Sequence, residues 1–392
     1  MSHAAGRSER EASPRIRDGL RECIWAFLGS RLLLFVLSAV GVGLLPLPQG
    51  QPTGVPGWPA HFPEAGWTVL FTATERQDAL WFLRIATQGY HPGDGSAAFF
   101  PFYPLAVKIV AWLPGLGPLG AALLVANACF FGALLVLHAL TRLELGAEAA
   151  RRTVLFAALF PTAFFFMAPY TEAPFLLLSI AAFWFARRDK WGWAALAGAG
   201  AASTRSIGVL LVFGLAVEAY RQHRHDYRPL WPRLGASLAV AAGPLLYAIW
   251  WLARFDDFWA PLQAQRNWAR TTTWPWTTVG RALNYAWRWH TYWLIDLLVV
   301  AVVVWGVVRA ARRIPAGYTV YAGLSLLLPL LFPFDDRPLM SMPRFAAVAF
   351  PAFWGFAVAA ERRRPPENAL VAAFAAGYGL LAILFVNWHY IF

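Results

Sequence analysis

Residues 76–104 read RQDALWFLRIATQGYHPGDGSAAFFPFYP, and the rest of the chain is arranged around this stretch. It is rich in aromatic side chains, it carries the acid Asp78, and glycine and proline interrupt it. A helix that crosses a bilayer needs about 20 consecutive apolar residues. Residues 76–104 therefore cannot span a membrane, whereas most of the sequence on either side can. We interpret the stretch as part of a large loop between membrane helices.

The composition supports this interpretation. Hydrophobic residues make up 59% of the 392-residue chain and charged residues only 14%, against roughly 25% charged residues in a soluble domain. The sequence predicts an all-α polytopic membrane protein with one domain, residues 22–392, after a basic tail, residues 1–21. The net charge of +12 lies in short arginine clusters between apolar segments, which is the pattern that orients membrane helices. Nucleic acid is therefore not an expected partner.

Two apolar blocks decide the topology. Residues 153–186 and 191–220 are each bounded on both sides by basic clusters. If basic clusters stay in the cytoplasm, each block must cross the membrane an even number of times. Each block is therefore predicted to form two short helices, with apices at residues 170–172 and 204–205 on the outer side. Half a block covers only about 21–24 Å, against roughly 30 Å of hydrocarbon, so the apices should face a protein-lined, wet cavity.

The same logic orders the remaining segments. Residues 22–45 form the first span, and residues 46–118 form the first outer loop, with an interfacial or re-entrant segment at 102–116. After a span at 119–141 and the two blocks, residues 234–253 lead to a second outer loop, 254–290. Spans at 292–308, 318–332, 344–360 and 369–388 complete the chain. The total is about eleven transmembrane helices, with the N-terminus in the cytoplasm.

This topology gathers the polar candidates on one side of the membrane, where ionisable residues at membrane depth indicate function by default. Asp78 shares a helical stripe with Trp81, Phe82 and Ile85, a side where a merely solvated carboxylate would not be placed. A helix cap or an ion pair is the alternative for Asp78. Arg205 is open to two interpretations, a salt bridge to Glu172 or Asp78, or contact with a lipid phosphate. The group as a whole is Asp78, Arg84, Glu172, Arg205, Arg270 and Arg344.

The motifs resemble the PIG-V mannosyltransferase family. The matching residues are Asp78-Ala-Leu-Trp-Phe-Leu, Gly89-Tyr90, the block AFFPFYP at 98–104, Tyr170-Thr171-Glu172, Arg205 with Gly208, and Arg344-Phe345 with Phe350-Pro351. They occur in order over most of the chain, and the AFFPFYP block is the most specific of them. One departure is Gln77, since the family typically has tryptophan before the acid. Packing on the acceptor side is therefore expected to differ.

The resemblance implies a GT-C membrane glycosyltransferase that inverts the anomeric centre of a sugar from a polyprenyl-phosphate donor. Asp78 matches the catalytic acid of the first outer loop, and we expect it to act as general base toward a lipid-linked or glycan acceptor. Four arginines are assigned to the donor phosphate and lipid, namely Arg205, Arg344, Arg84 and Arg270. Four residues are assigned to shaping the site, namely Tyr170, Glu172, Tyr90 and Tyr103.

The resemblance does not firmly imply any cofactor, and a divalent metal is not expected. If a divalent metal takes part, Asp78 and Glu172 are the nearest ligands. A bacterial inner membrane is the expected location, with the site on the outer face; a eukaryotic chain would lie in the endoplasmic reticulum membrane. The alternatives are a flippase or transporter of lipid-linked sugars and a non-catalytic subunit of a glycosylation complex. A transporter needs charges along a path through the membrane, whereas these gather on one face, which favours an enzyme.

Overall fold

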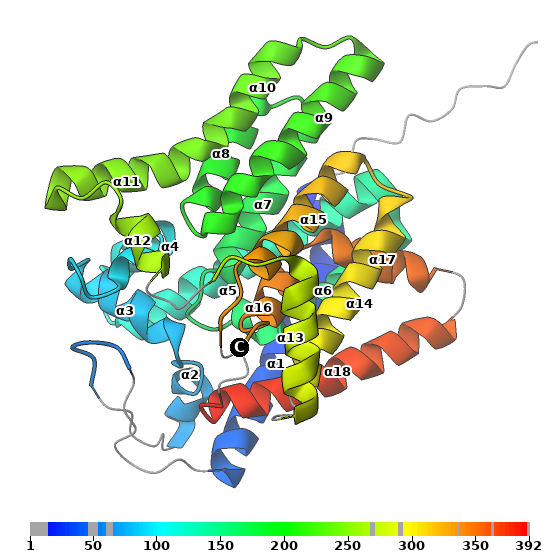
Figure 1. Ribbon diagram of the computed structural model, residues 1–392. Coiled ribbons are helices and arrows are strands. Elements are labelled where there is room, and N and C mark those ends of the chain that lie inside the picture. The colour runs from blue at the N-terminus through cyan, green and yellow to red at the C-terminus, as the bar shows by residue number, and fades with distance from the viewer. Residues whose placement is uncertain are drawn as a thin grey trace, which may run out of the picture.

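The computed structural model describes residues 15–45, 54–59, 66–266, 271–288, 293–335, 337–361 and 364–389, and their regular structure is helical (Figure 1). The first half of the chain contributes α1 (Leu20–Leu44), α2 (Val69–Thr72), α3 (Asp78–Gln88), α4 (Phe102–Val110), α5 (Pro118–Leu145), α6 (Ala147–Leu159), α7 (Glu172–Arg187), α8 (Trp191–Ala202) and α9 (Leu211–Asp226).

The second half contributes α10 (Leu230–Leu238), α11 (Ala242–Phe255), α12 (Ala260–Arg266), α13 (Pro275–Arg288), α14 (Trp293–Ala311), α15 (Ala316–Leu331), α16 (Met342–Ala347), α17 (Pro351–Ala359) and α18 (Arg364–Val386). The 3-10 turn Ala239–Ala241 joins α10 to α11. The all-α prediction is therefore confirmed.

Within the described residues, five helical segments are long and apolar enough to cross a membrane. They are Ile16–Leu44, Pro118–Leu145, Leu230–Phe255, Leu294–Ala311 and Pro366–Val386, and α15 is a shorter apolar helix. The chain is thus a multi-pass membrane protein. The predicted eleven spans exceed these five because several of them fall on helices too short to count by length, such as the 16-residue α7.

The two basic-bounded blocks break where the sequence predicted. The first becomes α6 and α7, joined by a turn that contains the 3-10 helix Ala163–Phe166. The second becomes α8 and α9, joined through the 3-10 helix Ser206–Leu210. The span predicted at 344–360 is divided into two helices, because α16 ends at Ala347 and α17 begins at Pro351. Proline has no N–H to donate to the carbonyl four residues earlier, here that of Ala347, which accounts for the break.

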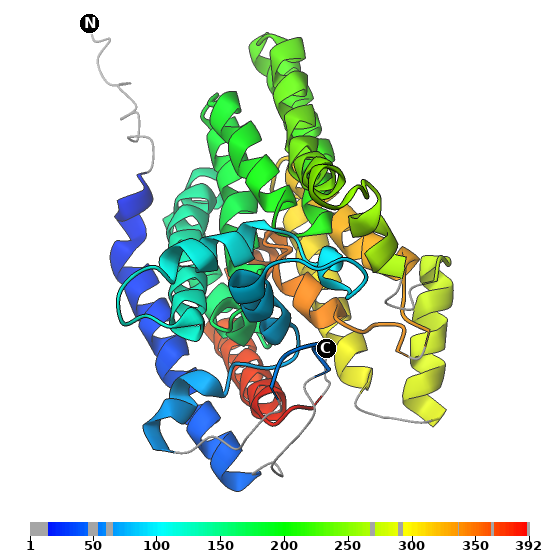
Figure 2. The same ribbon diagram turned by 90° about the vertical axis from the view of Figure 1, so that its left-hand side faces the viewer.

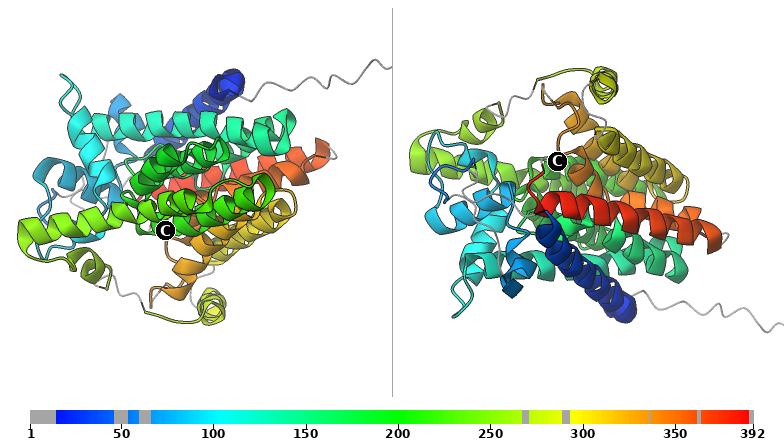
Figure 3. Two further views of the ribbon diagram at one scale, coloured as in Figure 1. Left: turned by 90° about the horizontal axis from the view of Figure 1, so that it is seen from above. Right: turned by 90° about the horizontal axis from the view of Figure 1, so that it is seen from below.

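The helices pack so that the loop elements collect at one end of the bundle. Helices α3, α4, α11 and α12 lie together on one side of the molecule (Figure 1), and Figure 2 views this side face-on, with α3 near its centre. Seen from below, α1 and α18 cross and are in contact (Figure 3). Helix α7 packs on both α5 and α8. It joins the loop end, where Glu172 begins it, to the opposite end, where Arg187 ends it.

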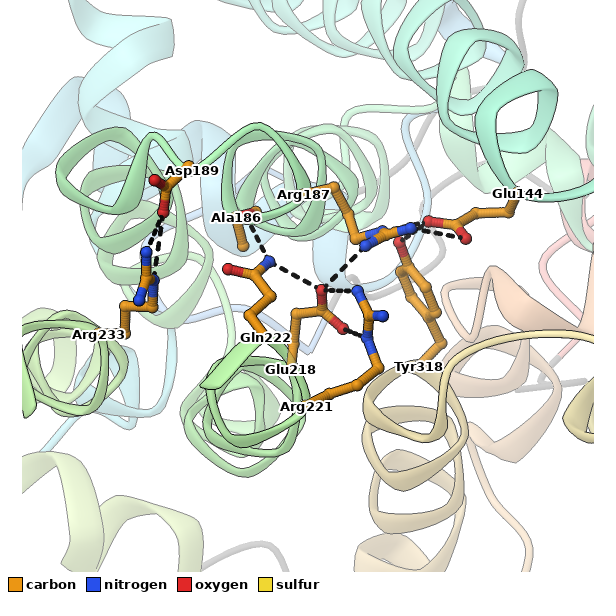
Figure 4. A network of polar contacts seen from close by, with 9 residues as sticks. All are labelled: Glu144, Ala186, Arg187, Asp189, Glu218, Arg221, Gln222, Arg233 and Tyr318. Atoms are coloured by element: carbon orange, nitrogen blue, oxygen red, sulfur yellow. Dashed lines mark hydrogen bonds and ion pairs between the residues drawn. The ribbon is translucent and has the colours of Figure 1, made fainter. Parts of the chain in front are cut away.

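A network of charges ties the helices together at that opposite end (Figure 4). Arg187 of α7 forms ion pairs with Glu144 of α5 and, at 3.2 Å, with Glu218 of α9. Arg221 contacts Glu218 at 2.8 Å, and the hydroxyl of Tyr318 on α15 donates to Glu144 at 2.8 Å. The network therefore joins the ends of α5, α7, α9 and α15. Because α7 runs from Glu172 to Arg187, the network also fixes the position of Glu172 along the bundle.

Replacing Glu218 with alanine is expected to destabilise the fold by about 2–3 kcal/mol, because it removes a buried carboxylate that pairs with both Arg187 and Arg221, while Arg187 keeps Glu144. The Glu218 side chain is 1% exposed. The midpoint of thermal unfolding in detergent measures the effect. Glu148→Ala is the matched control, since the Glu148 side chain is 60% exposed and an exposed pair contributes about 0–1 kcal/mol. Equal shifts for the two variants would contradict the structural role of the network.

Candidate functional site

Asp78 is the first residue of α3, and its neighbours fix its position. Gln77 before it has a φ of 52°, a left-handed conformation that is uncommon outside glycine. The buried Arg76 donates from Nε to the carbonyl of Val386 at the end of α18, at 2.8 Å. The hydroxyl of Tyr170 donates to the carbonyl of Arg76 at 2.9 Å. The turn that presents Asp78 is thus anchored from two distant parts of the chain.

Two carboxylates and two guanidinium groups meet beside this turn. Arg344 Nη1 donates to Asp78 Oδ2 at 2.6 Å, and its Nε lies 3.0 Å from Glu172 Oε1 as an ion pair. Arg205 also contacts Glu172 Oε1 and donates to the Thr171 hydroxyl at 3.2 Å. The four formal charges of Asp78, Glu172, Arg205 and Arg344 cancel. The predicted convergence of the two apices with Asp78 and the late arginine is therefore confirmed.

Burial distinguishes the members of this cluster. The Glu172 side chain is 0% exposed, those of Arg205 and Arg344 are 9% and 13% exposed, and that of Asp78 is 25% exposed. Asp78, Arg205 and Arg344 line a cavity of about 200 Å³, whose wall also includes Phe99, Gln265 and Ser341. Asp78 is thus the carboxylate of the cluster that a molecule in this cavity would contact. Glu172 is buried and forms ion pairs with both arginines.

The turn that carries Arg205 depends on a glycine. Arg205 is extended, with φ −151° and ψ 142°, between the end of α8 and the 3-10 helix Ser206–Leu210. The returning chain passes so close to α8 that a Cβ atom on Gly208 would lie 2.5 Å from the Cα atom of Ala202. Only glycine fits this approach without a backbone shift. The Arg205–Gly208 spacing in the sequence therefore reflects a steric requirement of the turn.

Hydroxyl and amide groups from three elements hold the loop that forms the cavity wall. Tyr90 and Tyr247 both donate to the carbonyl of Phe99, at 2.9 and 3.1 Å. Gln265 of α12 donates to the carbonyl of Ala98 at 2.9 Å. The ring of Phe99 stacks on Trp81 of α3, with 5.1 Å between the ring centroids. The loop after α3 and the segment from α11 to α12 are thus joined at this wall. The shaping role assigned to Tyr90 stays a prediction.

Arg84 does not line the cavity that contains Asp78. Its guanidinium pairs with Asp94 at 2.6 Å and stacks over Trp81 at 5.5 Å. Burial alone would raise the pKa of Asp94, but hydrogen bonds from Ser96 and Arg84 outweigh that effect and hold the pKa below its usual value. The Arg84 side chain is 6% exposed, so its charge is largely buried against Asp94 and Trp81. Its assignment to the donor stays a prediction.

The Arg84–Asp94 pair gives the loop a pH dependence. Because the pKa of Asp94 is depressed in the folded protein, the pair stabilises the fold above the ordinary carboxyl pKa, about 3.8. That contribution is lost as the pH falls through the folded-state pKa. The thermal midpoint of Asp94→Asn should therefore fall less between pH 5 and pH 3 than that of the wild type. A control, Asp256→Asn directly after α11, should keep the wild-type pH dependence. Identical behaviour of both variants would contradict the role of Asp94.

A second, larger cavity of about 690 Å³ adjoins the first. It lies between the end of α3, α4 and α11, and the two cavities share a wall, because Ser203 lines one and Thr204 the other. Lys108 of α4 and Arg254 of α11 line it, and neither has an acidic partner among the described residues. Its aromatic lining comprises Tyr90, Tyr247, Trp250 and Phe255. The cavity is positively charged and largely apolar.

Three further residues were predicted for the site, namely Tyr103, Tyr170 and Arg270. Tyr103 is fully buried and donates to the carbonyl of Ala122 at 2.9 Å, so it fixes α4 against α5. Tyr170 packs beside Arg344, whose guanidinium lies 5.4 Å from its ring centroid. Arg270 lies outside the described residues. The roles given to all three stay predictions.

The described residues contain no group of three or more His, Cys, Asp or Glu side chains placed to hold a metal ion. Glu172 Oε1 already faces two guanidinium groups. A divalent cation between Asp78 and Glu172 would therefore compete with Arg205 and Arg344 for the same oxygens. The donor set does not fit a metal in this arrangement.

The sequence analysis assigned no role to Lys108 or Arg254, which the structure brings together in the lining of one cavity. The available signal was a single lysine on a short amphipathic helix that follows the aromatic loop directly.

A comparison with known families identifies the family of the chain. Residues 56–301, more than half of the chain, match the family described as mannosyltransferase (PIG-V). Comparison with curated protein sequences finds no match.

Two solved structures of ArnT from Cupriavidus metallidurans are similar in fold. One is bound to undecaprenyl phosphate, with a TM-score of 0.51 at 14% identity over 94% of this chain and 76% of ArnT. The other is the apo state, with the same TM-score and identity over 95% and 77%. The Archaeoglobus fulgidus oligosaccharyltransferase matches at a TM-score of 0.41 and 13% identity, over 91% of this chain and 53% of that one. The chain therefore has an ArnT-like GT-C fold.

Proposed function

The chain belongs to the PIG-V mannosyltransferase family, and from this premise we propose that it transfers a mannosyl group from a polyprenyl-phosphate donor to a hydroxyl group of a lipid-linked or glycan acceptor. The observation that carries the proposal is Asp78. It is the most exposed of four clustered charged groups, and it lines a cavity built from both outer loops.

The proposed orientation puts this cavity at the outer face of the membrane. In it, about eleven helices cross the bilayer, residues 1–21 lie in the cytoplasm, and residues 46–118 and 254–290 form the outer loops. The charge network at the far end of α7 supports this arrangement, since it joins the arginine clusters that should stay inside. A 16-residue α7 covers only about 24 Å, so Glu172 and Asp78 lie below the outer interface.

Asp78 acts as the general base in this proposal. Arg344 holds Oδ2, and Oδ1 has no hydrogen bond to the described residues, so it can accept the proton of the acceptor hydroxyl. The acceptor oxygen then attacks the anomeric carbon as the bond from that carbon to the phosphate oxygen breaks. The proton remains on Asp78 and the electron pair leaves with the polyprenyl phosphate. Attack opposite the leaving group inverts the anomeric centre.

The larger cavity is the place we propose for the donor phosphate. Glu172 and Asp78 balance the charges of Arg205 and Arg344, whereas no acid among the described residues pairs with Lys108 or Arg254. The phosphate of a lipid donor brings the missing negative charge. ArnT bound to undecaprenyl phosphate supports a polyprenyl-phosphate donor by its similar fold. Arg205 and Arg344 remain candidates for the phosphate after bond cleavage, when its charge increases.

Exposed apolar side chains beside this cavity suit the lipid chain. Leu105 and Ile109 on α4 are 56% and 55% exposed, and Leu246 and Ile249 on α11 are 64% and 45% exposed. In a membrane protein such faces contact lipid. A polyprenyl chain could therefore run from the cavity between α4 and α11 into the bilayer, while its phosphate stays beside Lys108 and Arg254.

Transfer of radiolabel from polyprenyl-phosphate mannose to a membrane-extract acceptor by the purified protein tests the proposal. We expect transfer from this donor and none from a nucleotide-linked mannose. Label that crosses a vesicle membrane without transfer would instead indicate a transporter. Transfer only after another protein is added would indicate a non-catalytic subunit.

A further inference from the structure

A groove opens at the end of the bundle opposite the candidate active site. It encloses about 530 Å³ and lies between the start of α1 and the end of α7, along α5. Its floor is apolar and includes Leu135, Trp184 and Phe185. Its rim is basic and consists of Arg15, Arg17, Arg188 and Lys190. The mechanism proposed above uses none of these residues.

Three cations of the rim, Arg15, Arg17 and Lys190, have no acidic partner in the part of the chain that the structure describes. Asp18, the nearest acid along the chain, accepts a hydrogen bond from the backbone N–H of Arg15 and pairs with Arg142 at 3.2 Å. Asp189, next to the end of α7, pairs with Arg228 and Arg233. The rim is therefore suited to bind an anion.

The walls of the groove are held in place by packing. Gly19 lies so close to α5 that a Cβ atom would meet the ring of His138 at 2.2 Å, which fixes the start of α1 against α5. On the other wall the guanidinium of Arg188 stacks 3.9 Å from the ring centroid of Trp184, which is 3% exposed. The charge of Arg188 is therefore held over the apolar floor.

We propose that this groove binds an anionic phospholipid of the leaflet opposite the active site, with the phosphate on the basic rim and an acyl chain on the apolar floor. Basic pockets between transmembrane helices bind anionic headgroups in this way. Phospholipid fits better than soluble phosphate because the charged rim adjoins an apolar floor that only a lipid would cover. Such a lipid would fill the gap between α1 and α7.

Lipid binding to the purified full chain tests the inference, with native mass spectrometry as the readout. Dioleoyl phosphatidylglycerol and dioleoyl phosphatidylcholine are titrated separately. We expect at least a ten-fold preference of the wild type for phosphatidylglycerol, and at least a five-fold loss of that preference in Arg17→Gln/Lys190→Gln. Leu135→Trp fills the floor but keeps the cations, so it should weaken binding of the lipid as well. Glycerol 3-phosphate, which has the anion but no chain, should not compete.

The matched control is Arg309→Gln/Arg312→Gln. It removes the same charge from exposed positions at the end of α14, away from the groove, and should retain the preference. An equal loss in both double variants would overturn the proposal, because it would indicate general surface attraction. Equal binding of the two lipids by the wild type, or full competition by glycerol 3-phosphate, would also overturn it. Sugar transfer is not part of this readout, so the proposed enzyme activity can fail without affecting the result.

Discussion

Asp78→Asn is expected to lower the turnover number of sugar transfer by about 10²–10⁴-fold, the usual contribution of a general base. Asparagine has nearly the same shape, and its carbonyl oxygen can still accept the hydrogen bond that Arg344 donates to Asp78 at 2.6 Å. It cannot take up the proton of an acceptor hydroxyl group. The donor KM should change little, because the proposed phosphate contacts lie in the neighbouring cavity.

Initial rates with purified protein and radiolabelled polyprenyl-phosphate mannose measure the effect. The thermal midpoint checks that the variant is folded, since the substitution removes one of four charges that balance in the wild type. Asp256→Asn is the control, because Asp256 is an exposed carboxylate after α11 with a φ of 56°, a conformation that asparagine tolerates well. Wild-type turnover in Asp78→Asn would exclude the residue as the base.

The sequence predicted the grouping of Asp78, Glu172, Arg205 and Arg344 because topology alone carries that information. Basic clusters on both sides of an apolar block require an even number of crossings, and this brings both apices to the side of Asp78.

The pairing within the group could not be predicted in the same way. The notion that Arg205 and Arg344 bind a phosphate competes with internal ion pairs, and only three-dimensional contacts show that Glu172 engages both guanidinium groups. The ion pair between Arg84 and Asp94 could not be predicted either. The loop between them contains glycine and proline, and the sequence does not define its conformation. The position of Lys108 in a cavity could not be predicted, because α4 and α11, which together form this cavity, are far apart in the sequence.

Lys108→Gln and Arg254→Gln are each expected to raise the donor KM by about 10–150-fold. A hydrogen bond to a charged group contributes about 1.5–3 kcal/mol, and 1.4 kcal/mol corresponds to a factor of ten. Turnover at saturating donor should fall much less, since neither residue lines the cavity that contains Asp78. A short-chain polyprenyl-phosphate mannose, soluble enough to saturate the enzyme, allows the two constants to be separated.

Arg288→Gln is the control for this experiment, because Arg288 is an exposed cation at the end of α13 that lines neither cavity. Arg205→Ala discriminates between the two assignments of the phosphate. If Arg205 and Arg344 bind the ground-state phosphate, Arg205→Ala raises the donor KM and Lys108→Gln does not. If Lys108 and Arg254 bind it, the order is reversed, and Arg205→Ala lowers turnover because it loosens Glu172 and, through Arg344, the position of Asp78.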